Sequence, residues 1–279
     1  MIQVCHYCSS PIPYGQGVYV GEHTYHISCA IKYTLNFKQK YQDSLLNRYN
    51  VLGVGVGWRY RRYYGFLKQE ICIVVNVVKK VHEAYLPTAQ VIPKYISDIK
   101  TDVLEIHEVI APRPPTSYLY TRRERIRPAV GGVSIGHINV TAGTLGCLVR
   151  KDHEYFILSN NHVLANENEA YIGDPILQPG PYDGGRDPED RIAYLDECIP
   201  LKFNYGINYD DAALARPIRP ELVSPEIMGI GKPIEIAEPM LGMKVVKSGR
   251  TTGITYGEVI QIATLIRVKY NKGYAFFDN

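Results

Sequence analysis

The stretch that decides the fold is GTLGCLVRKDHEYFILSNNHVLA, residues 143–165. Two apolar runs, CLV and YFIL, flank the polar turn RKDHE. This pattern predicts two strands joined by a hairpin. The second run leads directly into Asn160, Asn161 and His162. The stretch therefore predicts a β-hairpin with a histidine at the end of its second strand.

The surrounding residues, from Ala129 to the last residue, repeat this short-strand pattern. Apolar runs such as GGVSIGHINV and KVVKSGRTTGITYGEVIQI are separated by glycine and proline turns. Such spacing predicts a β-barrel or a β-sandwich. We therefore expect this half of the chain to be built almost entirely of strands.

A second polar site follows at Asp211, in the segment Tyr209-Asp-Asp-Ala-Ala-Leu214. A serine or cysteine nucleophile needs a base that removes its proton, and the base needs a carboxylate that fixes its tautomer. His162 and Asp211 are residues of those two types. A histidine at a strand end is more often a surface or capping residue, so the pair by itself is weak evidence for catalysis.

The order of these motifs resembles a known family. GTLGCLVRKDHEYFILSNNHVLA is similar to the histidine hairpin of trypsin-like (chymotrypsin-fold) serine peptidases, DDAALA resembles their Asp-x-Ala-Leu motif, and KSGRTTGITYGEV resembles the opening of the second barrel in bacterial members. The likeness covers residues 129–265. The earlier runs VLGVGVG and TDVLEI also look like bacterial trypsin-like proteins related to the plant narrow-leaf protein. The resemblance implies His162 as general base, Asp211 as its orienting carboxylate, and a protein or peptide substrate.

The resemblance implies an incomplete trypsin-like double β-barrel at residues 129–279. The whole chain is expected to be mainly β, and the residues before the barrel, considered below, predict an N-terminal zinc finger at 1–47, a small α/β segment at 48–110 and a linker at 111–128. Asp210 precedes Asp211, but neighbours on a strand point to opposite faces. The motif match selects Asp211.

The nucleophile of that family is carried by Gly-Asp-Ser-Gly, which this sequence does not contain. Ser248 is followed by glycine but lacks the preceding Gly-Asp, and is expected to be an exposed turn serine. Cys147 and Cys198 lack the Gly-x-Cys-Gly context of cysteine peptidases on this fold, and there is no HExxH. We expect the peptidase domain to lack its C-terminal part, the chain alone to be inactive, and a C-terminal complementing fragment to be a candidate partner.

The first thirty residues contain a separate site. Cys5 and Cys8, and then His26 and Cys29, form C-x2-C and H-x2-C pairs. Tetrahedral zinc requires such a set of ligands, and four protein ligands make a structural site with no open position. The alternatives are His23 in place of His26, which gives a wider gap to Cys29, or a set of ordinary buried cysteines.

The residues around these pairs predict the fold of the zinc module. GQGVYVGEHTYH reads as a small hairpin, and AIKYTLNFKQKYQDSLLNRY has helical spacing. Knuckle, hairpin and helix resemble one half of a LIM finger or a related treble-clef ribbon over residues 3–35. One structural Zn²⁺ is expected. A competing hypothesis follows for the whole chain: a non-catalytic zinc-dependent protein-binding module fused to a degenerate peptidase barrel.

The middle of the chain predicts a hairpin, made by VLGVGVGWRYR and KQEICIVVNVVKKV, followed by a short helix and a strand in PKYISDIKTDVLEIHEV. The glycines of VLGVGVG alternate with valine and do not follow G-x-G-x-x-G, so we interpret them as strand glycines rather than a dinucleotide loop. The linker APRPPTSYLYTRRERIRP is expected to be extended.

Arginines in WRYRRYY and RRERIR are compatible with phosphate binding, but the formal net charge is only +3. Nucleic acid is therefore not favoured as a partner. No window approaches a membrane span of ~18 uninterrupted apolar residues, and the N-terminus shows no secretion signal. The expected compartment is the cytoplasm, and no membrane partner is expected.

Overall fold

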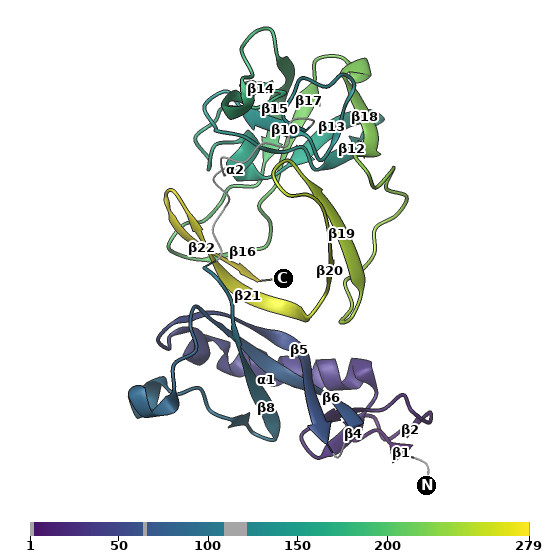
Figure 1. Ribbon diagram of the computed structural model, residues 1–279, viewed down its shortest axis with the longest axis vertical. Coiled ribbons are helices and arrows are strands. Elements are labelled where there is room, and N and C mark those ends of the chain that lie inside the picture. The colour runs from purple at the N-terminus through teal and green to yellow at the C-terminus, as the bar shows by residue number, and fades with distance from the viewer. Residues whose placement is uncertain (1–2, 64–65, 109–121, 279) are drawn as a thin grey trace.

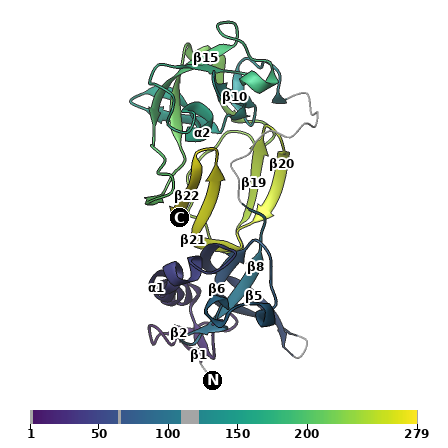
Figure 2. The ribbon, with the colours of Figure 1, turned by 90° about the vertical axis from the view of Figure 1, so that its left-hand side faces the viewer.

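The mainly β architecture is confirmed by the computed structural model, which describes residues 3–63, 66–108 and 122–278. Figure 1 shows the α/β elements below, a curled sheet above, and two β-hairpins between them. Figure 2, turned by a quarter, shows the same arrangement from the side, with both hairpins bridging the two parts.

The N-terminal elements are four short strands and one long helix. They are β1 (Gln3–Val4), β2 (Pro11–Ile12), β3 (Val18–Val20), β4 (His23–Tyr25) and α1 (Ile27–Leu46). The order is the expected one of knuckle, hairpin and helix. The buried side of α1 carries Ala30, Thr34, Lys38 and Leu45 at helical spacing. This side packs on the sheet that contains β5 and β6.

Two long strands form the centre of that sheet. β5 (Val51–Tyr63) and β6 (Phe66–Val77) make the predicted antiparallel hairpin, and β8 (Ile99–Glu105) lies parallel to β6. The predicted short helix near residue 95 is wrong, because those residues form β7 (Tyr95–Ile96) and a tight turn into β8. Burial of Ile96 and Ile99 on either side of this turn favours the hairpin. Helical turns occur earlier, at η1 (Glu83–Tyr85) and η2 (Thr88–Gln90).

The glycines of VLGVGVG are strand glycines, as expected. A Cβ on Gly53 would lie 2.9 Å from the carbonyl oxygen of Leu265, and one on Gly57 would lie 2.8 Å from that of Ile260. The absence of side chains here allows another strand to approach β5 closely.

That strand is β21 (Gln261–Tyr270), which pairs antiparallel with β5 and with β22 (Gly273–Asp278). β22 in turn pairs with the short strand β16 (Ile207–Asn208). The resulting sheet contains nine strands. β3 pairs with β6 on the other side, so the sheet combines residues from three of the predicted segments, 1–47, 48–110 and 129–279.

The curled sheet is antiparallel and contains seven strands in the order β11-β10-β14-β15-β17-β13-β12. Their bounds are β10 (Ser134–His137), β11 (Gly143–Thr144), β12 (Cys147–Lys151), β13 (Glu154–Ser159), β14 (Pro175–Leu177), β15 (Arg191–Cys198) and β17 (Ala213–Pro217). Its concave face encloses a core that includes Ile135, Leu145, Ile157 and Ile176. β9 (Ala129–Gly131) and β18 (Val223–Ile227) pair alongside.

The other hairpin, β19 (Lys244–Gly249) and β20 (Gly253–Glu258), forms a two-stranded sheet of its own. Most of the predicted linker lies outside the described residues, as do the side chains of the arginine-rich hairpin tip from residue 60 to residue 68. In the described part of the chain, no helix is both long and apolar enough to cross a membrane.

Candidate catalytic pair and metal site

His162 and Asp211 meet in the structure. Nδ1 of His162 lies 2.6 Å from Oδ2 of Asp211, and the backbone N–H of His162 donates to Oδ1 at 3.3 Å. Both side chains are largely covered, with 17% and 11% of their areas exposed. Asp210 is exposed. The structure therefore brings together the two residues that the sequence singled out.

The elements that carry these two residues explain why their side chains are in contact. His162 lies in the short helix α2 (Asn161–Leu164), which follows β13 directly. Asp211 lies between β16, in the nine-stranded sheet, and β17, in the curled sheet. Because β13 and β17 are paired neighbours, the end of one strand is placed beside the start of the other.

Asn160 and Asn161, which precede His162, hold the segment around the histidine in place through side-chain hydrogen bonds. The Asn160 amide donates to the Asp211 carbonyl oxygen at 2.9 Å. Asn161 is fully buried, and its amide donates to the Ile199 carbonyl and to the Asn168 side chain. Sequence reasoning noted these asparagines without assigning them a role. The loop is thus held by side-chain hydrogen bonds to the backbone as well as by packing.

A third side chain, Tyr270 from β21, was missed by the sequence analysis. Its hydroxyl donates to Oδ2 of Asp211 at 2.8 Å, and its ring meets the His162 ring edge-on with centroids 5.8 Å apart. Tyr270 is distant from both motifs in sequence, and it occurs in the run VKYNKGY, which has no catalytic signature. No sequence signal would have identified it.

The electrostatics favour an ionised carboxylate. Burial raises the pKa of Asp211, but the hydrogen bond and charge of His162, and then the hydrogen bond from Tyr270, outweigh it, so the pKa lies below its ordinary value. Burial, and then the Asp211 charge, raises the pKa of Tyr270. An ionised Asp211 accepts the Nδ1 proton of His162, which leaves the other ring nitrogen free to act as a base.

The nucleophile candidates of the sequence lie elsewhere. Ser248 is half-buried inside β19 rather than exposed on a turn, and its hydroxyl contacts the Met228 carbonyl and the Arg122 guanidinium. Cys147 and Cys198 lie at the ends of β12 and β15, and burial raises the pKa of both thiols. Among the described hydrogen bonds, none joins any of these three residues to His162.

The metal candidates also meet. One ligand atom each of Cys5, Cys8, His26 and Cys29 can be chosen so that all lie within 4.8 Å of one another, a group that could hold a metal ion. Cys5 and Cys8 flank the first turn, His26 is the N-cap of α1, and Cys29 lies in the first turn of that helix. His23 lies in β4, and its ring stacks on that of His6 at 3.9 Å.

The orientation of His26 and the closeness of the three thiols also fit a bound metal ion. Nε2 of His26 lies 3.1 Å from the Pro11 carbonyl oxygen, so it donates there and turns Nδ1 toward Cys8. Burial raises the pKa of Cys5, but backbone hydrogen bonds from Cys8 and His26 outweigh it and lower the pKa to about 6. Burial and the neighbouring thiols raise the pKa of Cys29 to about 11. Three thiolates this close repel one another, so a cation is needed to hold all of them ionised.

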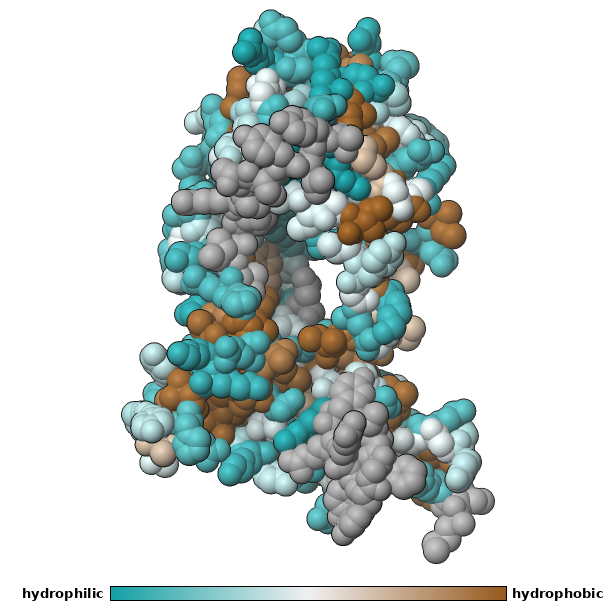
Figure 3. All heavy atoms as spheres, viewed as in Figure 1, coloured by the Kyte–Doolittle hydropathy of each residue, from teal (hydrophilic) through white to brown (hydrophobic). Residues whose placement is uncertain are grey.

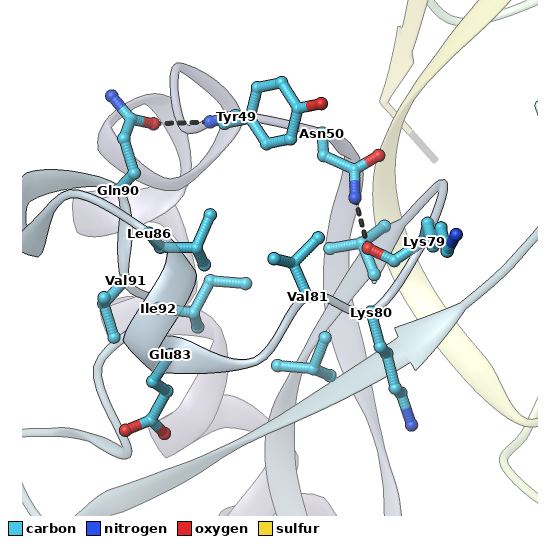
Figure 4. Close-up of a pocket in the computed structure, with 12 residues that line it drawn as sticks. Tyr49, Asn50, Lys79, Lys80, Val81, Glu83, Leu86, Gln90, Val91 and Ile92 are labelled. Atoms are coloured by element: carbon cyan, nitrogen blue, oxygen red, sulfur yellow. Dashed lines mark hydrogen bonds between the residues drawn. The ribbon is translucent and has the colours of Figure 1, made fainter.

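A separate pocket of about 190 Å³ lies in the α/β part of the molecule. Figure 4 shows Val81, Leu86 and Ile92 around its interior, with Lys80 and Glu83 at its margin. It is lined by residues from β6 to β8 and by Tyr49 and Asn50, which precede β5, and its lining includes neither His162 nor a metal ligand. The pocket is therefore distinct from both candidate sites.

Comparison with known proteins agrees with part of the sequence resemblance. No protein-family model matches the chain. The chain is similar to Protein NARROW LEAF 1 of Oryza sativa subsp. japonica, with 27% identity over 273 residues. The match covers 85% of this chain and 45% of the rice protein, so the chain spans less than half of that protein's length.

Proposed function

We propose that this chain supplies the base and the orienting carboxylate of a Ser-His-Asp endopeptidase. The observation that carries the proposal is the hydrogen bond of 2.6 Å between Nδ1 of His162 and Oδ2 of Asp211. A partly exposed histidine with its Nδ1 held by a buried carboxylate has the arrangement that a nucleophile's base requires. The family resemblance of the flanking motifs supports the same reading.

In the complete enzyme, a serine hydroxyl attacks the peptide carbonyl while His162 takes the hydroxyl proton. His162 then gives this proton to the leaving amine, and Asp211 stabilises the imidazolium. In the family that this chain resembles, the serine and the oxyanion hole belong to a Gly-Asp-Ser-Gly motif, and this sequence does not contain that motif. We therefore propose that the chain alone does not hydrolyse peptides.

The test starts with the DNA beyond codon 279, read in all frames, and expression of the longest continuation. A fluorophosphonate probe should label the continued protein, and His162→Ala should abolish labelling. Asp211→Asn should slow labelling by about 10⁴-fold. Asp210→Asn is the matched control, since this exposed neighbour should leave labelling unchanged. Labelling that is indifferent to His162→Ala, or no labelling at all, would refute the proposal.

We further propose that the partner is a C-terminal complementing fragment that adds strands to the β19–β20 hairpin. Two strands alone are marginally stable in water. Val245, Val246 and Tyr256 of this hairpin are exposed, and the space-filling view shows an opening between the hairpin and the neighbouring part of the molecule (Figure 3). Added strands would cover these side chains and pair the open edges.

Hydrogen exchange tests this partner directly. Amides of β19 and β20 should exchange within seconds in the chain alone and become protected when the downstream segment is supplied as a separate fragment. The β13 amides, which lie between two paired strands, serve as the internal reference. Unchanged exchange of β19 and β20 at a saturating fragment concentration would contradict the proposal.

For the N-terminal cluster we propose one structural Zn²⁺, because three sulfur atoms and one imidazole nitrogen are the donors that zinc prefers. Its thiols need a reducing compartment, which supports the cytoplasm as the location; the six cysteines are all unpaired. A nucleic-acid partner is not proposed.

The competing function is a zinc-dependent protein-binding module joined to a barrel without catalysis. The closed four-ligand cluster favours it, because such sites organise surfaces rather than activate water. On this reading, Cys29→Ser abolishes capture of the chain's binding partner and His162→Ala leaves it intact. The reverse pattern would support the peptidase instead.

A further inference from the structure

The carboxylate of Asp211 has two side-chain donors rather than one. Its Oδ2 accepts both the Nδ1 proton of His162, at 2.6 Å, and the hydroxyl proton of Tyr270, at 2.8 Å. Its Oδ1 receives the backbone N–H of His162. Tyr270 is only 8% exposed, and its ring also packs on Phe203. A buried hydroxyl that finds a charged acceptor at this distance is part of a defined network rather than a general core contact.

We propose that Tyr270 is a positioning residue of the catalytic pair: its hydroxyl holds the Asp211 carboxylate in the orientation that receives the His162 proton. The inference rests on the proposed function of His162 and Asp211. It adds a residue that comes from the nine-stranded sheet, whereas His162 lies in α2, directly after β13 of the curled sheet. The pair is therefore completed only when these two parts of the molecule are docked.

The hairpin that carries Tyr270 is held at both ends. At its turn, Glu167 accepts the backbone N–H groups of Asn271 and Lys272, and Glu167 itself lies in the loop that follows His162. At the other end, the ammonium group of Lys38 in α1 bonds Asp278 at 3.2 Å, and this lysine is 2% exposed. These anchors fix Tyr270 relative to Asp211 without depending on the tyrosine hydroxyl. Removing the hydroxyl should therefore leave the fold intact.

The charged and titratable groups around the carboxylate are few. His162 faces it from α2 and Tyr270 faces it from β21, while the Glu167 charge acts on Tyr270 from the loop after α2. Asp210, next in sequence, is exposed. Both facing groups stabilise the ionised carboxylate, so the loss of either should make Asp211 easier to protonate.

The test is an NMR titration of the chain with ¹⁵N-labelled histidine, followed from neutral to acid pH. In the wild-type chain, the Nδ1 resonance of His162 should show an acid inflection where Asp211 takes up a proton. In Tyr270→Phe, we expect this inflection to move to higher pH by about one unit, which corresponds to one hydrogen bond to a charged group. The control is Tyr274→Phe on the adjacent strand, whose hydroxyl donates to Glu108 and whose loss should leave the inflection in place.

An unchanged inflection in Tyr270→Phe would overturn the proposal. A wild-type chain whose Nδ1 carries no hydrogen-bonded proton would instead overturn the His162–Asp211 pair itself, so the two failures are distinguishable. A second readout needs no substitution: with ¹³Cζ-labelled tyrosine, one resonance should shift with the same midpoint as the His162 inflection. If no tyrosine resonance follows that midpoint, Tyr270 is not bonded to Asp211.

Discussion

A buried ion pair links Arg250, in the turn of the β19–β20 hairpin, to Asp183, which lies between β14 and β15 of the curled sheet, and breaking that pair should lower stability strongly. Nε and Nη2 of Arg250 each lie 2.5 Å from an oxygen of Asp183, and the two side chains are 2% and 4% exposed. The Ser134 hydroxyl is bonded to the same carboxylate. Arg250→Met removes the cation and leaves Asp183 buried with one donor from Ser134. The expected loss in free energy of unfolding is about 3–5 kcal/mol.

The hairpin itself offers a matched control. Lys244 and Glu258 form an ion pair on the same two strands, but 80% of the lysine side chain is exposed. Lys244→Met should therefore cost less than about 1 kcal/mol. The double variant Arg250→Met with Asp183→Asn should recover a large part of the loss, because it removes the unpaired buried charge.

Equilibrium unfolding in urea, followed by circular dichroism, measures these differences from the midpoints and the common slope. Tryptophan fluorescence is unsuitable, since Trp58 lies in the α/β part. The reasoning would be refuted if Arg250→Met shifted the midpoint no further than Lys244→Met. It would also be refuted if the double variant were less stable than Arg250→Met.

Three further predictions concern the two sites. The purified chain should contain about one zinc ion per molecule, as measured by atomic absorption. Cys29→Ser should lower this zinc content by at least tenfold, whereas Cys198→Ser should leave it unchanged. Equal zinc contents in the two variants would contradict the proposed cluster. Because the pKa of Asp211 is lowered by folding, its contribution to stability is present above the ordinary carboxyl range near pH ~4 and is lost as pH falls through the folded value. Asp211→Asn should therefore be less stable at neutral pH and lose less stability on acidification, and unfolding curves with identical pH slopes for both chains would rule this out. Gly143→Ala should cost about 1–3 kcal/mol in thermal unfolding, because its Cβ would lie 2.3 Å from Val163 beside the histidine; Gly257→Ala, whose nearest atom is 3.6 Å away, is the control, and a similar cost for both would contradict the packing argument.

Part of the fold and of both sites could be predicted from local patterns. The α1 helix follows from the spacing of its apolar residues, and the β12–β13 hairpin from two apolar runs around a polar turn. The metal cluster follows from two close pairs of ligands, because short spacing forces each pair onto one turn. The short helix expected near residue 95 was wrong, since burial of Ile96 and Ile99 outweighed local preference.

What the sequence by itself determined is therefore local: strand and helix content, the ligand spacing, and the residue types at His162 and Asp211. The tertiary structure decided which distant segments meet. Glycines on β5 allow β21 to lie against it, and this pairing places Tyr270 on Asp211. Tyr270 and Asp211 are 59 residues apart in the chain, and no periodicity connects them. Such contacts depend on how sheets pack and close, which is a property of the whole chain rather than of any stretch of it.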